Sequence, residues 1–366
     1  MKLPRSSKLS ALSLPLTISL LASTTVLAQE SSDRVEEVMV IGRAEFIEKE
    51  FTARRVGSTV DTAKLMNQVP GGAANNNGPL TGQIQYRGMF GPRINVRVDG
   101  MLIHGGGPNW MAPPLHHIPA GLMEELVVEQ GIQSISTGGG IGGAATALWK
   151  RPDYSLDNDW EFGGDMEYAL GSADGSTSAS GVFGVSNANH RLYLVGSQDE
   201  GDDYETPAGT VTATQYERSV YGFGYGFQND VHELDINIHK IATEDTGTPS
   251  LPMDIDWFET ETWNISYRTE ISGFGIEARL YGSEIDHGMS NSLLRQTPDF
   301  SSLPLPPFVG DDQRNVLTDS DENGFKLTLD WELGGGTAIV GIEGKDATHN
   351  ATVYDADFAP FFVNNF

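Results

Sequence analysis

The sequence is poor in two kinds of residue, and both shortages narrow its function. Its 366 residues include no cysteine, so the chain forms no disulfide and supplies no thiolate to a metal ion. Lysine and arginine together number 23 against 50 aspartate and glutamate residues, a formal net charge of −27. This balance argues against a nucleic-acid partner, because phosphates require basic contacts. It fits a surface that attracts cations or simply stays soluble, and it names no ligand.

Long apolar runs are also missing. After residue 28 no stretch resembles a transmembrane helix, which needs about 20 apolar residues. This absence does not exclude a membrane protein, since a strand of a transmembrane barrel needs only about 10 residues and every second one faces lipid. The mild overall hydropathy of the chain is compatible with such a barrel.

Sequence motifs for catalysis are absent as well. The chain contains neither GxSxG nor HExxH, and its glycine-rich runs lack the strand-to-helix setting and the lysine of a phosphate-binding loop. Acidic pairs such as Glu36-Glu37 and Asp202-Asp203 are typical of solvated charge. We therefore expect a protein that is not an enzyme and has no catalytic cofactor.

The first 28 residues are predicted to be a secretory signal peptide. Lys2, Arg5 and Lys8 precede a short apolar stretch at 12–21, and residues 26–28, Val-Leu-Ala, form a small-residue cleavage site. The apolar stretch is too short and too rich in Ser and Thr to span a membrane. An ordinary amphipathic helix is the alternative. Loss of these three cations on export would take the net charge from −27 to about −30.

Residues 154–366 alternate with period two. Apolar side chains on one face alternate with polar or small ones on the other in four clear segments, at 221–228, 233–239, 263–268 and 325–332. In water such segments would form a sheet of a soluble sandwich. With aromatic residues on the apolar face and polar residues on the other, they fit a barrel with lipid outside and water inside.

Connection lengths favour the barrel over the sandwich. Short turns are expected at 187–189, 228–230, 272–273 and 334–336, and long loops at 199–213, 244–257 and 293–321. Short turns on one side and long loops on the other are typical of an outer-membrane barrel. About nine antiparallel strands can be counted, whereas bacterial barrels close with an even number. We therefore expect residues 154–366 to be a partial transmembrane β-barrel of an incomplete chain.

Residues 46–153 have a different texture, with glycine-rich turns and little helix. The expected elements are a helix at 62–68 capped by Asp61 and strands at 84–87, 94–99 and 126–129. Four motifs occur in order: Arg87-Gly88, Val98-Asp99-Gly100, 127–131 (VVEQG) and the closing run 138–152. This region resembles the α+β plug domain of TonB-dependent outer-membrane receptors. The resemblance implies that the plug blocks a barrel in the bacterial outer membrane.

Residues 29–45 form a polar lead followed by a short apolar run. From the residues alone, the run is either a first strand of the domain or a flexible edge strand for a partner. Its place before a plug resembles the TonB box, which a periplasmic energy-coupling protein binds. This resemblance implies TonB contacts by Glu37, Val38, Met39, Val40, Ile41 and Gly42.

One pair of side chains suggests a metal site. In the strand that begins at Phe274, the apolar residues fix the other face as the lumenal one, and both His287 and Met289 fall on that face near the long-loop end. Their Cα atoms would be about 7 Å apart. Imidazole and thioether ligands suit Cu(I). Met111, in the plug loop at 105–114, is a candidate third ligand.

The same segments resemble the copper-receptor branch of the TonB-dependent family. They are 105–114 (GGGPNWMAPP), 246–255 (TGTPSLPMDI) and 286–291 (DHGMSN). In that branch a plug Cys-x-x-x-Met and a barrel His-x-Met bind copper, which implies metal ligation by Met111, His287 and Met289. The cysteine position is Gly107 here, so the strongest soft ligand is missing. The alternative is that these residues only pack the loop and line the lumen.

Further ligand contacts are expected from His104, Asn109, His116 and His117, in or beside the same loop. The histidines either replace the lost ligand or serve as hydrogen-bonded structure. We assign no ligand role to Met253.

The sequence thus predicts a TonB-dependent receptor that takes up a scarce nutrient, with copper or a copper complex as the favoured cargo. Its partners would be TonB, outer-membrane lipid and the ligand, without nucleic acid. The alternatives are a siderophore or zinc receptor of the same family, and a truncated binding fragment that does not transport.

Overall fold

The computed structural model describes residues 50–106, 112–131, 138, 140–297 and 313–365. The chain divides into two units, Met1–Glu45 and Phe46–Phe366, and all described residues belong to the second. The predicted signal peptide and TonB-box segment, including residues 37–42, therefore lie outside the described residues. Among those residues, no helix is long and apolar enough to cross a membrane.

The predicted plug domain is built on two small sheets. The larger one has the strand order β1-β6-β7-β5, in which β5 runs parallel to β7 and the other pairs are antiparallel. Its strands are β1 (Glu50–Ala53), β5 (Asn95–Val98), β6 (Met123–Glu129) and β7 (Ala144–Trp149). The smaller sheet contains β2 (Gly72–Asn76), β3 (Gly82–Tyr86) and β4 (Met89–Phe90). Four short 3-10 helices connect them: η1 (Thr62–Gln68), η2 (Gly91–Arg93), η3 (Pro114–His117) and η4 (Ala120–Leu122).

The helix predicted at 62–68 is present, although it is a 3-10 helix. Asp61 caps it as expected, because its side chain accepts a hydrogen bond from the Ala63 amide at 3.0 Å. The other carboxylate oxygen accepts the Gly82 amide, also at 3.0 Å, and so ties the helix to β3. The cap is therefore also a tertiary contact, which sequence spacing alone does not indicate.

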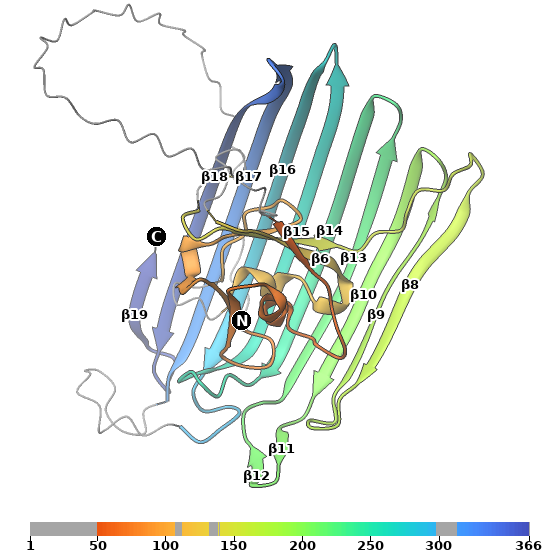
Figure 1. Ribbon diagram of the computed structural model, residues 1–366. Helices are drawn as coiled ribbons and strands as arrows, with labels where there is room; N and C mark the ends of the chain where they lie inside the picture. The colour runs from red at the N-terminus through yellow and green to blue at the C-terminus, as the bar shows by residue number, and fades with distance from the viewer. Residues whose placement is uncertain (1–49, 107–111, 132–137, 139, 298–312, 366) are drawn as a thin grey trace, which may run out of the picture. The chain divides into compact units, whose positions relative to one another are not determined.

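A ten-stranded antiparallel sheet follows the plug (Figure 1). The strand order is β8-β9-β10-β13-β14-β15-β16-β17-β18-β19, and β8 and β19 form its two edges. The strands are β8 (Glu161–Leu170), β9 (Thr177–Ser186), β10 (His190–Gly201), β13 (Tyr216–Gln228), β14 (His232–Thr246), β15 (Asp254–Ile271), β16 (Phe274–Ser290), β17 (Asn315–Leu333), β18 (Gly336–Tyr354) and β19 (Pro360–Asn365). A separate hairpin pairs β11 (Tyr204–Thr206) with β12 (Gly209–Val211).

The two faces of this sheet are chemically opposite, as the alternation predicts. Apolar side chains on one face are exposed, among them Leu194, Tyr221, Ile238 and Leu280 at 61%, 58%, 54% and 52%. Polar side chains on the other face are buried against the plug: Arg218, Asn237, His239, Asn264 and Glu322 are each 1% exposed. A soluble protein would have the reverse pattern, so this sheet is suited to lipid outside and a polar interior.

Glycines along these strands make room for aromatic rings on the neighbouring strand. A Cβ on Gly324 would lie 2.2 Å from the Tyr281 ring, and one on Gly224 would lie 2.1 Å from the Tyr193 ring. Both tyrosines are almost fully buried on the lumenal face, at 1% and 2% exposure. The glycine-aromatic alternation in the sequence therefore reflects cross-strand packing.

The strand count and the bounds of the long loops differ from the prediction. The sheet has ten strands where about nine were counted, because β19 carries no apolar alternation and Pro360 begins it. The loop expected at 293–321 ends sooner, since β17 already begins at Asn315. In this first part of β17 the outward residues Asp319 and Asp321 are polar, so the sequence shows no period-two apolar pattern there. The loop expected at 244–257 is shorter too, spanning only the residues between β14 and β15.

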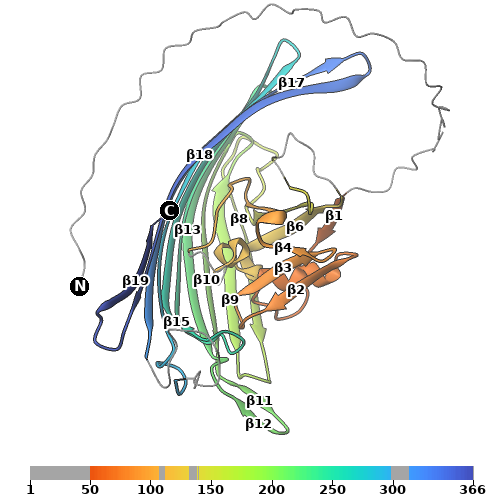
Figure 2. The same cartoon turned by 90° about the vertical axis from the view of Figure 1, so that its left-hand side faces the viewer.

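The plug lies on the concave side of the sheet (Figure 2) and is held there by polar contacts. Asp99, in the Val98-Asp99-Gly100 motif, is the centre of one set. Its carboxylate accepts from Arg151 and from Asn237 and Asn264 at 3.2 and 3.1 Å, and its carbonyl oxygen accepts from Arg279 at 2.6 Å. Although burial raises the pKa of Asp99, the charges of Arg151 and Arg279 outweigh burial and lower it. The ionised side chain of Asp99 thus fixes the plug to β14 and β15, and its backbone carbonyl fixes it to β16.

We predict that Gly324→Ala destabilises the barrel sheet by about 1–3 kcal/mol, because the added methyl group overlaps the buried Tyr281 ring. The unfolding temperature in detergent should fall by several degrees. Gly163→Ala is the matched control, since a Cβ at this strand glycine would have no heavy atom within 4 Å. Equal unfolding temperatures for the two variants would contradict the packing account.

Candidate functional site

His287 lies where the sequence places it, on the inner face of β16 near its end. Its side chain is 1% exposed, and its register partner across the strand pair is Phe258 of β15. The two rings meet edge to face with centroids 4.7 Å apart. The Nε2 atom is buried and has no hydrogen-bond partner among the described residues. An imidazole nitrogen without a partner is available to a ligand.

Met289 shares this face and lies one residue before the end of β16. It is 5% exposed and packs in a small cluster with Met253 and Val316. Leu251 and Val353 pack against the same cluster. The structure therefore gathers a second thioether, Met253, beside Met289, although no ligand role was predicted for it.

The plug loop approaches these residues at its base. A Cβ on Gly105 would lie 2.1 Å from the Ala112 carbonyl oxygen, so the chain leaves and returns at nearly the same point. A Cβ on Gly106 would lie 2.8 Å from Ile285, 3.2 Å from Phe258 and 3.7 Å from the His287 Cβ. Only glycine permits this approach to the barrel wall. The predicted ligand Met111, the predicted contact Asn109 and the cysteine position Gly107 lie outside the described residues.

His116 and His117 are buried in η3 and are used as hydrogen-bonded structure. The His116 ring nitrogens lie 3.1 Å from the Leu80 carbonyl oxygen and 3.2 Å from the Thr243 hydroxyl. His117 Nδ1 lies 3.2 Å from the Thr260 hydroxyl. Burial lowers the pKa of His116 well below its usual value and that of His117 to about 4. Both imidazoles are therefore neutral at neutral pH and fasten the plug to β14 and β15.

His104 is bound by a barrel carboxylate. Its ring Nδ1 and its backbone amide each lie 3.2 Å from oxygens of Glu322 in β17. Lys345 and His349 of β18 reach the same carboxylate. The sequence analysis missed Glu322, and only strand register could have indicated it, because 218 positions separate it from His104.

The described residues offer an incomplete set of metal donors. Among them, no group of three or more His, Asp or Glu side chains is arranged to hold a metal ion. The inner face of β16 instead presents the His287 imidazole and the Met289 thioether, and Met253 packs beside Met289 from the connection between β14 and β15. Both ligand types suit a soft cation such as Cu(I). A third ligand would have to come from a side chain such as that of Met111.

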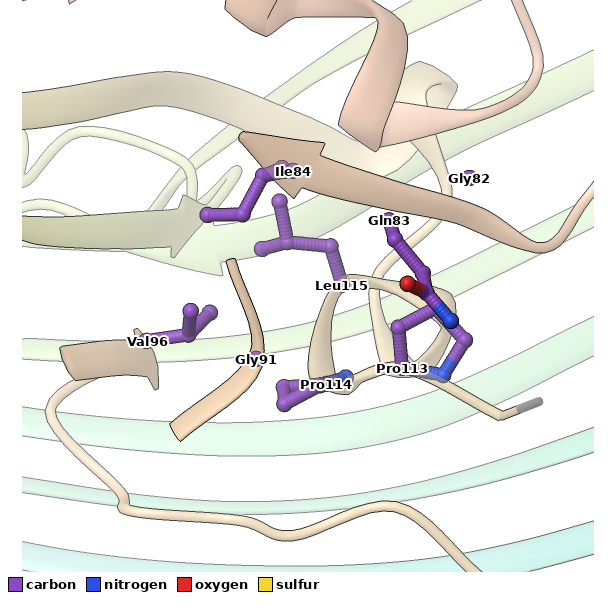
Figure 3. A pocket seen from close by; sticks show the side chains of 8 residues that line it. All are labelled: Gly82, Gln83, Ile84, Gly91, Val96, Pro113, Pro114 and Leu115. Atoms are coloured by element: carbon purple, nitrogen blue, oxygen red, sulfur yellow. The ribbon is translucent and has the colours of Figure 1, made fainter. Parts of the chain in front are cut away.

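The small cavity within the plug does not add a ligand site. It is lined by residues of β3, η2, β5 and η3, including Ile84, Val96 and Leu115 (Figure 3). Its volume is about 10 Å³, which is the space needed by one water molecule. This cavity is therefore too small for a nutrient-sized ligand.

Comparisons with known proteins agree with the two-part architecture. The profile of the TonB-dependent Receptor Plug Domain family matches residues 43–144. The chain is similar in structure to the copper transporter OprC, with a TM-score of 0.75 and 22% identity over 88% of this chain and 49% of that one. P. aeruginosa FpvA, solved in complexes with pyoverdines, matches with a TM-score of 0.62 and 13% identity, over 87% of this chain and 48% of FpvA. The FrpB iron transporter of Neisseria meningitidis matches with a TM-score of 0.56 and 15% identity, over 84% of this chain and 48% of FrpB.

At these identities the structural likeness shows a common fold. This chain spans about half the length of each of the three proteins. A search of curated protein sequences finds no match. The predicted fold class, a transmembrane β-barrel with an N-terminal plug domain, is thereby confirmed, with the barrel represented by ten strands.

We predict that the plug loses stability as pH falls from about 6.5 towards 4. An unfolded plug takes up a proton at His117 near the ordinary pKa of 6.5, whereas the folded plug does so only near 4. The contribution of neutral His117 to the free energy of unfolding is therefore fully present above pH 6.5. It decreases by about 3 kcal/mol as the pH falls to 4. His117→Gln, which keeps a hydrogen-bonding group, should flatten the profile. Hydrogen exchange of plug amides, measured without metal at several pH values, would test this, and parallel profiles would contradict it.

Proposed function

The chain carries the plug domain of TonB-dependent receptors and shares their fold, and on this basis we propose that it takes up a scarce nutrient across the outer membrane. Proteins of this kind lie in the outer membrane of Gram-negative bacteria, which agrees with the predicted export signal. In the proposed mechanism, the barrel forms the pore and the plug blocks it. The ligand binds between plug loop and barrel wall.

We propose copper, as Cu(I) or a small copper complex, as the cargo. The observation that carries this proposal is the meeting of the plug loop with the inner face of β16, where His287 offers a buried Nε2 without a partner among the described residues. Met289 follows two residues later on the same strand face. A neutral imidazole and thioethers favour a soft monovalent cation over hard divalent ions.

Met111 is the proposed third ligand. It directly precedes Ala112 in the sequence, and the Ala112 carbonyl oxygen lies against Gly105 at the loop base. The loop base in turn contacts the wall beside His287. Gly107 supplies no side chain, so the proposed site contains no thiolate. Its three neutral ligands would therefore bind Cu(I) more weakly than a set that contains one.

The other predicted contacts take different parts in the proposal. His116 and His117 support the site by fixing the plug, since their rings are engaged with Thr243 and Thr260. His104 and Asn109 remain proposed contacts for a copper complex larger than the bare ion. The segment Glu37 to Gly42 is the proposed attachment point of TonB, whose pull would supply the energy for opening.

A second cargo class within the same fold is an iron complex. FpvA, solved with pyoverdine, and the FrpB iron transporter share the fold, although at lower TM-scores than OprC. Zinc is a further alternative, and a truncated chain that binds without transport is another. Protection of the plug loop by a siderophore, with no protection by Cu(I), would favour the iron complex.

We predict that the protein extracted from outer membranes binds about one Cu(I) under anaerobic conditions. Met111→Ala, His287→Ala and Met289→Ala should each weaken binding by tenfold or more, about 1.4 kcal/mol, because each removes one of three ligands. Met166→Ala is the matched control, since this methionine is 74% exposed on the outer face of β8. Titration against a competing Cu(I) chelator measures the effect. Equal affinities in all variants would reject the site.

We predict that Gly107→Cys tightens Cu(I) binding by at least tenfold. The variant introduces the only thiol of the chain, at the position where the copper-receptor pattern has its cysteine. The gain should disappear in the Gly107→Cys, His287→Ala double variant if both side chains hold the same ion. A gain that survives loss of His287 would show that the new thiol binds copper elsewhere.

A further inference from the structure

Glu322 is a fully enclosed carboxylate on the face of the barrel sheet that meets the plug. It is 1% exposed, and strand register explains its surroundings. Its direct partner on β18 is Ala347, so Lys345 and His349, two residues to either side, point from the same face. The small Ala347 side chain leaves space between them. The strand pair thus builds a pocket of donors around one carboxylate before the plug is considered.

The plug completes this pocket with a backbone group. Glu322 Oε2 accepts the His104 amide at 3.2 Å, while Oε1 lies 3.1 Å from Lys345 Nζ, 3.2 Å from His104 Nδ1 and 3.4 Å from His349 Nε2. The Lys345 ammonium also contacts His104 Nδ1. A buried carboxylate is costly unless it is paired and hydrogen-bonded, so these contacts favour one position of the His104 backbone.

His104 lies two residues before Gly106, whose backbone packs against Ile285, Phe258 and His287. From these contacts we infer that Glu322 is a positioning residue, which fixes the His104 amide and thereby holds Gly106 against His287. The inference rests on the proposed copper site for its functional consequence. Its structural content, an anchored loop base, is independent of the cargo.

Two double variants separate positioning from simple charge balance. Glu322→Gln with Lys345→Met and Glu322→Ala with Lys345→Met both remove the carboxylate and the ammonium, so neither leaves an unpaired buried charge. They differ in the acceptor, because the glutamine oxygen can still accept the His104 amide and alanine cannot. The space that alanine leaves would loosen the surrounding plug as well, which the Asp99 amide reports. Both variants carry Lys345→Met for a second reason. If Lys345 were present, its ammonium would compete with the His104 amide for the single side-chain oxygen of glutamine.

The readouts are hydrogen exchange of the His104 amide and anaerobic Cu(I) titration, both on the protein extracted from outer membranes. The alanine double variant should exchange His104 at least tenfold faster than the glutamine double variant and bind Cu(I) about tenfold more weakly. The Asp99 amide, which donates to the Ala147 carbonyl oxygen at 2.7 Å, is the internal control and should exchange equally in both.

Each other outcome has a definite meaning. Equal His104 exchange in the two double variants overturns the positioning role. A parallel rise at His104 and Asp99 also overturns it, because Glu322 would then hold the whole plug. Faster His104 exchange with unchanged Cu(I) affinity rejects the link to the metal site. Failure of the wild-type protein to bind Cu(I) rejects the proposed cargo, while the exchange comparison still decides whether Glu322 anchors the loop base.

Discussion

The polar contact between plug and barrel wall is the constraint on which the rest of the structure depends. Period-two strands place apolar residues on the outer face, so the inner face receives the polar ones. Some inward barrel side chains, among them Val182, Phe258 and Ile285, join the apolar core of the plug. The buried polar groups of the interface must in addition be paired. Asp99 and Glu322 show how this is done, each by binding several donors. The Asp99 contacts hold the plug to β14, β15 and β16, and the Glu322 contact lies two residues before Gly106, which meets His287.

The same constraint bears on how a plug can move. The hydrogen bonds and ion pairs of an interface can be replaced one at a time by hydrogen bonds to water. Separation of an apolar interface instead exposes its whole area at once. Arg218 illustrates the arrangement, since its guanidinium bonds both to Asp199 of the barrel and to the Val60 carbonyl oxygen of the plug. When the plug contact breaks, the ion pair with Asp199 can persist. The barrel side of the interface is therefore already satisfied in part without the plug.

Local patterns predicted much of the fold, and long-range partners escaped prediction. Alternation along the strands indicated which face of β16 carries His287 and Met289, and the Asp61 cap was recognisable from the residues that follow it. The first residues of β17 were assigned to a loop, because the outward Asp319 and Asp321 give no apolar signal. Glu322 and its plug partner His104 are far apart in sequence, and only the register of β17 with β18 brings Lys345 and His349 to them. Spacing within one segment contains no information of this kind.

The absence of a thiolate would bear on the proposed transport as much as on binding. A transported ion must bind well enough to enter and weakly enough to leave. In the proposed site, His287, Met289 and Met111 are neutral ligands, and the loss of any one of them leaves only two. A small displacement of the loop base would separate Met111 from the barrel ligands, because His287 and Met289 belong to β16 while Met111 belongs to the plug. If the plug carried a thiolate, its bond to the ion could retain the ion on the plug after the barrel ligands had moved away. A site divided between plug and barrel and made of weak ligands would therefore release its cargo when the two parts separate, so the same contacts that position the loop would also set the affinity.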